Sequence, residues 1–118
     1  MDIIILFFVV LILDGIYLYL SSSISLPVIE KIQSSPLRLN YSYAFLCYVL
    51  IIFQLYYFII KKKENILNAF LLGFTTYGIV ELTNAAIFKN WDYNLVILDM
   101  LWGGILYALS TYIIYNMY

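Results

Sequence analysis

The sequence predicts an all-α fold, an integral membrane bundle of four transmembrane helices in a single domain. Hydrophobic residues make up 65% of the 118-residue chain and charged residues only 11%. A soluble domain has about 45–50% apolar and about 25% charged residues, so this chain lacks the polar groups to cover a soluble surface. In addition, four apolar runs each approach the ~20 residues that a helix needs to cross the hydrocarbon core. We therefore expect the lipid bilayer to be the partner of most of its surface.

The four expected spans cover residues 3–20, 43–60, 66–88 and 93–115. The first run is not read as a secretory signal, because Asp2 stands where a signal carries positive charge and no clear small-residue cleavage site follows. Backbone polar groups in lipid must be paired within their own segment, so we expect helices. Residues 21–40 are rich in serine and contain Pro27 and Pro36, which predicts a loop with room for one short interfacial helix around residues 27–33.

The basic residues predict the orientation of the bundle. Three of the six lie together at Lys61–Lys63, which favours a cytoplasmic position for that connection. Four spans then place both termini in the cytoplasm and the 21–40 loop outside. Lys31 and Arg38 lie in that outer loop and oppose this orientation.

Composition also excludes several classes of function. A net charge of −1 is unlike that of a nucleic-acid-binding protein, which concentrates Lys and Arg on one face. The chain has no histidine and one cysteine, Cys47, so it can form neither an intramolecular disulfide nor a zinc site of the usual kind, a histidine-ligated di-iron centre or a Ser-His-Asp triad. We expect no cofactor.

Three acidic residues lie inside apolar runs: Asp14, Glu81 and Asp99. An ionised carboxylate at the centre of a span costs ~3 kcal/mol on insertion scales, so three such residues need an explanation. Each lies about five to seven residues from the expected outer end of its span, and at about 1.5 Å per residue their depths agree to within about one helical turn. We therefore expect the three side chains to gather in the same half of the bilayer.

Aromatic residues share the helical faces of these acids. The pairs, at offsets of three or four residues, are Asp14 with Tyr17, Glu81 with Tyr77, and Asp99 with Trp102. Asn84 adds an amide on the face of Glu81. Glycines near these positions favour close helix approach. Tyr17, Tyr77 and Tyr107 lie deep in their spans and need hydrogen-bond partners there, and Gln54 is expected to form an interhelical hydrogen bond.

The motifs resemble one family of membrane proteins along nearly the whole chain. They are Leu13-Asp14-x-x-Tyr17 in the first span, Tyr77-Gly-x-x-Glu81-Leu-Thr-Asn84 followed by Lys89-x-Trp91 around the third, and Asp99-x-x-Trp102-Gly103 in the fourth. This pattern is similar to that of domain of unknown function 2177, whose members are predicted four-span membrane proteins. Tyr17 replaces the family's usual Trp, Glu81 its usual Asp and Asn90 its usual Gly. The resemblance implies a four-span bundle marked by the three acids, and it implies no activity.

Three functions fit the acidic cluster. In the first, Asp14, Glu81 and Asp99, with Asn84, Tyr17, Tyr77 and Trp102, bind or conduct a proton, a hard cation or a small ligand, and so short a chain would act as a homo-oligomer or a pore. The second is a structural or assembly role in a larger complex or a virus particle, with neutral carboxyl groups joining helices. The third, a lipid- or isoprenoid-acting enzyme, predicts a cleft that opens sideways between helices. We favour the first, and a role other than catalysis over an enzyme.

Overall fold

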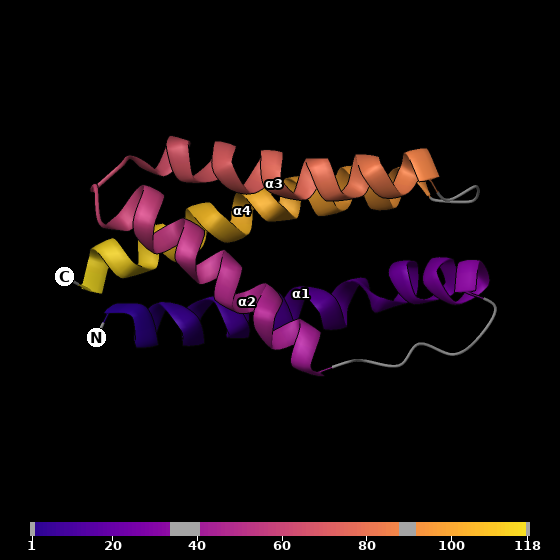
Figure 1. Ribbon diagram of the computed structural model, residues 1–118, viewed down its shortest axis with the longest axis horizontal. Coiled ribbons are helices and arrows are strands. Elements are labelled where there is room, and N and C mark those ends of the chain that lie inside the picture. Colours follow the sequence, from indigo (N-terminus) through magenta and orange to yellow (C-terminus); the bar gives the residue numbers. More distant parts are fainter. Residues whose placement is uncertain (1, 34–40, 88–91, 118) are drawn as a thin grey trace.

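A computed structural model describes residues 2–33, 41–87 and 92–117 of the chain, and those residues form helices and no strand. The elements are α1 (Asp2–Gln33), α2 (Tyr41–Gln54), its π-helical continuation η1 (Leu55–Ile60), α3 (Ile66–Ile87) and α4 (Tyr93–Met117). Successive helices run in opposite directions, so both chain ends lie at the same end of the bundle as the turn after η1 (Figure 1). The predicted all-α four-helix bundle is confirmed, and four segments are long and apolar enough to span a membrane.

Helix α1 is longer than the sequence predicts. Residues 21–33 continue it as a helix, so the prediction of a loop there is wrong, and the short helix expected around residues 27–33 is part of α1. Residues 34–40 of the predicted loop lie outside the described residues. Once a helix has formed, each further residue adds one backbone hydrogen bond. The serines of residues 21–33 and Pro27, which lacks only its own N–H donor, therefore do not end the helix. At about 1.5 Å per residue, 32 residues exceed the ~30 Å hydrocarbon core.

The second span ends in a π-helical turn that the sequence did not indicate. The Lys61 N–H donates to the Tyr56 carbonyl at 2.8 Å, and the Glu64 N–H donates to the Ile59 carbonyl at 2.9 Å, each five residues back. Lys63 has a φ of 53° and reverses the chain. The Tyr115 hydroxyl donates to the Glu64 carbonyl at 2.7 Å, which ties the end of α4 to this turn.

Glycines bring α3 and α4 into very close contact. A Cβ atom on Gly73 would lie 2.1 Å from the Gly103 carbonyl oxygen and 2.6 Å from the Tyr107 ring. A Cβ atom on Gly104 would lie 2.6 Å from the Phe70 ring. Gly104 therefore packs against a helix of its own chain. In lipid no hydrophobic effect drives helices together, so such close packing supplies much of their attraction.

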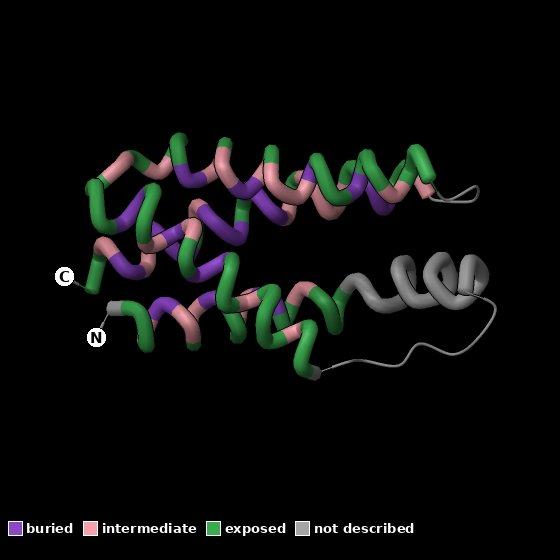
Figure 2. The backbone as a smooth tube through the Cα atoms, in the orientation of Figure 1, coloured by how far each residue is buried: buried purple, intermediate pink, exposed green. Residues whose placement is uncertain are grey.

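Burial divides the faces of the helices (Figure 2). Buried and exposed positions alternate along each helix in the tube of Figure 2. Large apolar side chains such as Ile4, Leu50 and Ile79 are exposed. An apolar exterior suits a protein whose surroundings are lipid tails, and most of the buried core is apolar as well. The faces that point inward carry the polar residues described below.

The glycine contact leads to a first prediction. Replacing Gly73 with Ala should lower the free energy of unfolding by about 1–3 kcal/mol, because the new methyl group would overlap backbone atoms of α4. Replacing Gly15 with Ala is the matched control, since its Cβ would meet nothing within 4 Å. Thermal unfolding of both variants in detergent measures the difference, and equal melting temperatures would contradict the close approach of α3 and α4.

Candidate functional site

Two of the three intramembrane acids belong to one hydrogen-bonded unit between α1 and α4. The Trp102 Nε1–H of α4 donates to Asp14 Oδ1 of α1 at 3.0 Å. In return, the Tyr17 hydroxyl of α1 donates to Asp99 Oδ1 of α4. We call these four residues the carboxylate clasp. Each helix thus supplies one acceptor and one donor to the other.

The spacing of the motifs explains this reciprocal arrangement. Each helix carries an acid followed three residues later by an aromatic donor, and the two helices run in opposite directions (Figure 1). Three steps forward along α1, from Asp14 to Tyr17, therefore correspond to three steps back along α4, from Trp102 to Asp99. The Tyr17 and Trp102 rings stack between the two bonds, with centroids 4.7 Å apart and planes at 5°. Both donor groups are thereby held in fixed positions.

Tyr48 connects α2 to the clasp. Its hydroxyl donates to Asp14 Oδ2 at 2.5 Å, so both oxygens of this carboxyl group are occupied. Asp14 is only 7% exposed. The indole N–H of Trp102 can only donate, whereas the hydroxyl of Tyr48 can donate or accept. Oδ2 therefore faces a group that can exchange the roles of donor and acceptor, whereas Oδ1 faces a group that can only donate.

A second polar group lies in the bundle nearer the Lys61–Lys63 turn. The Tyr107 hydroxyl donates to Gln54 Oε1 at 2.5 Å, and Gln54 Nε2 donates to Thr76 Oγ1 at 3.3 Å. This Gln54 network joins α2, α3 and α4. It confirms the interhelical bond expected of Gln54, and Tyr17 and Tyr107 both have the partners that their depth requires.

The positions of the predicted site residues on α3 follow from their burial and from packing contacts between α3 and α4. Glu81 is 4% exposed, and the contact between Gly78 and Met100 puts it within about one turn of Asp99 along the antiparallel pair. Asn84 is half-buried one turn further along. Tyr77 packs against the backbone of Gly103 and edge-on to the Tyr107 ring, at 6.4 Å. The tyrosine thus lies between the clasp and the Gln54 network on the α4 surface.

The described residues hold no group of three acidic, cysteine or histidine side chains close enough to bind a metal ion. Thr83, whose oxygen suits hard cations, is exposed and donates to the Ile79 carbonyl of its own helix at 2.6 Å. The Asp14 oxygens instead face N–H and O–H donors. This arrangement suits a carboxyl group that exchanges hydrogen bonds or protons.

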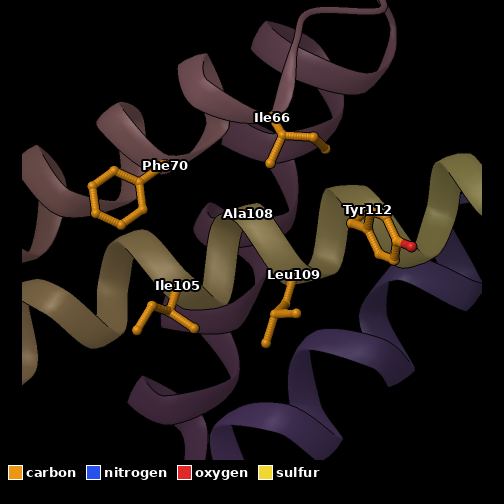
Figure 3. A pocket seen from close by; sticks show the side chains of 6 residues that line it. All are labelled: Ile66, Phe70, Ile105, Ala108, Leu109 and Tyr112. Carbon is orange, nitrogen blue, oxygen red and sulfur yellow. The ribbon is translucent and has the colours of Figure 1, made fainter.

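Two grooves on the outside of the bundle are lined by apolar and aromatic side chains. One of about 360 Å³ lies between α3 and α4 (Figure 3), and its lining residues are Ile66, Phe70, Ile105, Ala108, Leu109 and Tyr112. The other lies between α1 and α2, and its lining residues are Ile3, Ile4, Phe7, Phe8, Phe45, Val49 and Ile52. Neither groove includes Asp14, Glu81 or Asp99, so neither brings a lipid-shaped ligand to a carboxyl group.

Sequence reasoning missed Tyr48. Its position five residues inside the expected second span, 43–60, was a usable signal, because a tyrosine hydroxyl buried at that depth needs a partner. The chain has 13 tyrosines, and because tyrosines are common at the ends of membrane spans, this one did not stand out. Which acid it would contact depends on the crossing of α2 over α1, which no local pattern encodes.

Four apolar helices around buried carboxyl groups define a small multi-pass integral membrane protein. The chain belongs to DUF2177, a family of predicted membrane proteins, whose pattern matches residues 1–116. The resemblance found from the motifs is thus confirmed. No curated protein and no solved structure matches the chain.

Substitutions of Asp14 test the clasp. Asp14→Leu should lower the free energy of unfolding by about 1–3 kcal/mol for each donor left without an acceptor, those of Tyr48 and Trp102. Asp14→Asn should cost much less, because the amide oxygen accepts from Trp102 and the amide nitrogen donates to the Tyr48 oxygen. Chemical unfolding in mixed micelles measures both variants. If Leu and Asn cost the same, the two hydrogen bonds do not stabilise the bundle.

Proposed function

We propose that this protein binds and releases a proton at Asp14 and passes it along the interior of the bundle. The observation that carries the proposal is the pair of hydrogen bonds to Asp14, one from a group that only donates and one from a hydroxyl that can reverse. Such a pair accommodates both protonation states of the carboxyl group. The neighbouring Asp99, with Tyr17, supplies a second acceptor in the same unit.

The surroundings of Asp14 act on an ionised carboxyl group in two opposite ways. Lipid disfavours the ionised form, by ~3 kcal/mol at a span centre. Hydrogen bonds to the carboxylate favour that form and offset part of this cost. All six basic residues lie outside the four spans, so no lysine or arginine of the spans holds Asp14 permanently ionised.

A proton fits the site better than a metal cation. A metal ion would have to share the Asp14 oxygens with the donors Trp102 and Tyr48, and the positive ends of those N–H and O–H dipoles would repel it. It would also need several oxygen ligands around it. A proton needs one acceptor at a time, and tyrosine hydroxyls can relay it.

Polar groups continue from the clasp toward the Lys61–Lys63 end. On α4 the Asp99 and Trp102 turn is followed by Tyr107, which is fully buried and bonded to Gln54. Tyr115 follows at the end of the helix, bonded to the turn. These groups form a route within one chain, so the proposal does not require the homo-oligomer that the sequence alone offered beside a pore.

A structural role is the second candidate. The hydrogen bonds of the clasp, of Tyr48 and of Gln54 all join different helices, which is what a bundle held in register by polar contacts requires. The two candidates differ in one respect. A structural clasp needs hydrogen bonds alone, whereas proton exchange also needs a group that can ionise.

Proton flux into vesicles separates the two candidates. Acidifying the outside of vesicles that contain the wild-type protein should acidify the lumen faster than in empty vesicles. Asp14→Asn should abolish this difference, because an amide cannot ionise, while helicity and melting stay close to wild type. Asp99→Asn and Glu81→Gln test the other two acids in the same assay, and Tyr48→Phe should slow the flux by removing the reversible hydroxyl.

Asp92→Asn is the control for the flux assay. Asp92 precedes α4 and bonds the backbone of Asn94, outside the buried interior, so its substitution should leave the flux unchanged. Wild-type flux no greater than that of empty vesicles, or full flux through Asp14→Asn, would overturn the proton-binding function and favour the structural one.

We also propose that the Lys61–Lys63 turn faces the cytoplasm, together with both termini, because clustered basic residues favour that side. In a Cys47→Ser background, cysteine introduced at Lys62 should react with a membrane-impermeant maleimide only after cells are opened. Cysteine introduced at Asn94, exposed at the other end of the bundle, should react in intact cells. The reverse pattern would invert the orientation.

A further inference from the structure

Two hydroxyl groups in the C-terminal half of α4 are buried without a hydrogen-bond partner. Ser110 and Thr111 are both 0% exposed. Among the described residues nothing within hydrogen-bonding distance pairs with Ser110 Oγ or Thr111 Oγ1. Buried polar side chains are nearly always paired, with protein groups or with ordered water.

Other threonines of the chain show how unusual this is. A helical Ser or Thr readily satisfies its hydroxyl by donating to the carbonyl four residues back. Thr75, Thr76 and Thr83 all do so, at 2.7, 2.7 and 2.6 Å. Ser110 and Thr111 lie in the same kind of helix and leave that bond unmade. Their hydroxyls are therefore available to a partner other than their own backbone.

The position of the pair indicates what that partner does. On α4 it lies between Tyr107, which bonds Gln54, and Tyr115, which bonds the Ile59 and Glu64 carbonyls. The contacts of Gly73 with Gly103 and Tyr107 place the small Ala69 side chain of α3 beside the turn of α4 that runs from Tyr107 to Thr111, because the two helices run in opposite directions. Ala69 is also fully buried. The two unpaired hydroxyls therefore lie in the interior of the bundle, between two tyrosines whose hydroxyls are bonded.

We propose that Ser110 and Thr111 form a binding site for buried water, which continues the polar interior from the Gln54 network to Tyr115 and the Lys61–Lys63 turn. Water is the ligand that fits, because it is small and can donate to and accept from hydroxyl groups at the same time. The proposal of a water site rests on the two unpaired hydroxyl groups. Its role as the cytoplasmic end of a proton route rests on the proposed function.

Water-edited solid-state NMR of the protein in phosphatidylcholine vesicles tests the site directly. Magnetisation from water should reach the Ser110 and Thr111 side chains several times faster than it reaches the Thr75 side chain. Thr75 is exposed on the lipid side, and its hydroxyl is bonded to its own helix. Signals are assigned with Ser110→Ala and Thr111→Val. Transfer to Ser110 and Thr111 as slow as transfer to the fully buried Leu106 would overturn the water site, whatever the flux.

The flux assay tests the role of the water. The double variant Ser110→Ala/Thr111→Val should lower proton flux several-fold, while Thr75→Val, which removes a hydroxyl that already has its partner, should not. Fast water transfer together with unchanged flux in the double variant would keep the water site and overturn its place in the route. Wild-type protein without flux would overturn the proposed function, and the NMR result would still decide the site.

Discussion

The structure depends on the need to satisfy a buried carboxyl group in a solvent that offers no hydrogen bonds. In water Asp14 would be solvated at no cost, but within a bilayer its partners have to come from the chain. Trp102 and Tyr48 supply them from two other helices. Three helices are thereby fixed to one point, and their rotation about their own axes is fixed with it, because a turned helix would withdraw its donor.

Close packing joins one pair of helices in the bundle, and hydrogen bonding joins another pair. The contact of α3 with α4 relies on Gly73 and Gly103, whose backbones approach too closely for any side chain. The contact of α1 with α4 relies on the reciprocal bonds and stacked rings of the clasp. In a bilayer, an apolar side chain is attracted to lipid tails about as strongly as to another apolar side chain. The glycine packing and the hydrogen bonds of the clasp therefore supply the attraction between helices that the hydrophobic effect supplies in water. The polar interior is thus a structural necessity as well as the place where protons could bind.

Much of the site could be read from spacing. An acid with an aromatic donor three residues later, on two helices of opposite direction, predicts two groups on one face of each helix. It does not predict that each acid accepts from the other helix's aromatic residue, as Asp14 does from Trp102. Nor could spacing reveal Tyr48 as a partner, or show that Ser110 and Thr111 forgo the backbone bond that Thr75 makes. These features depend on distances between helices, which local patterns do not contain.

The sequence by itself determined the class of protein, the number of helices, the three acids of the spans and several of the aromatic residues near them, because hydropathy and helical periodicity are local properties. It was misleading at residues 21–33, where serines and a proline favoured a loop and the helix in fact continues. Only the tertiary structure decided which donor meets which carboxyl oxygen. The physical reason is that the crossing of α2 and the glycine contact of α3 with α4 set the helix rotations jointly, through contacts between residues far apart in the chain.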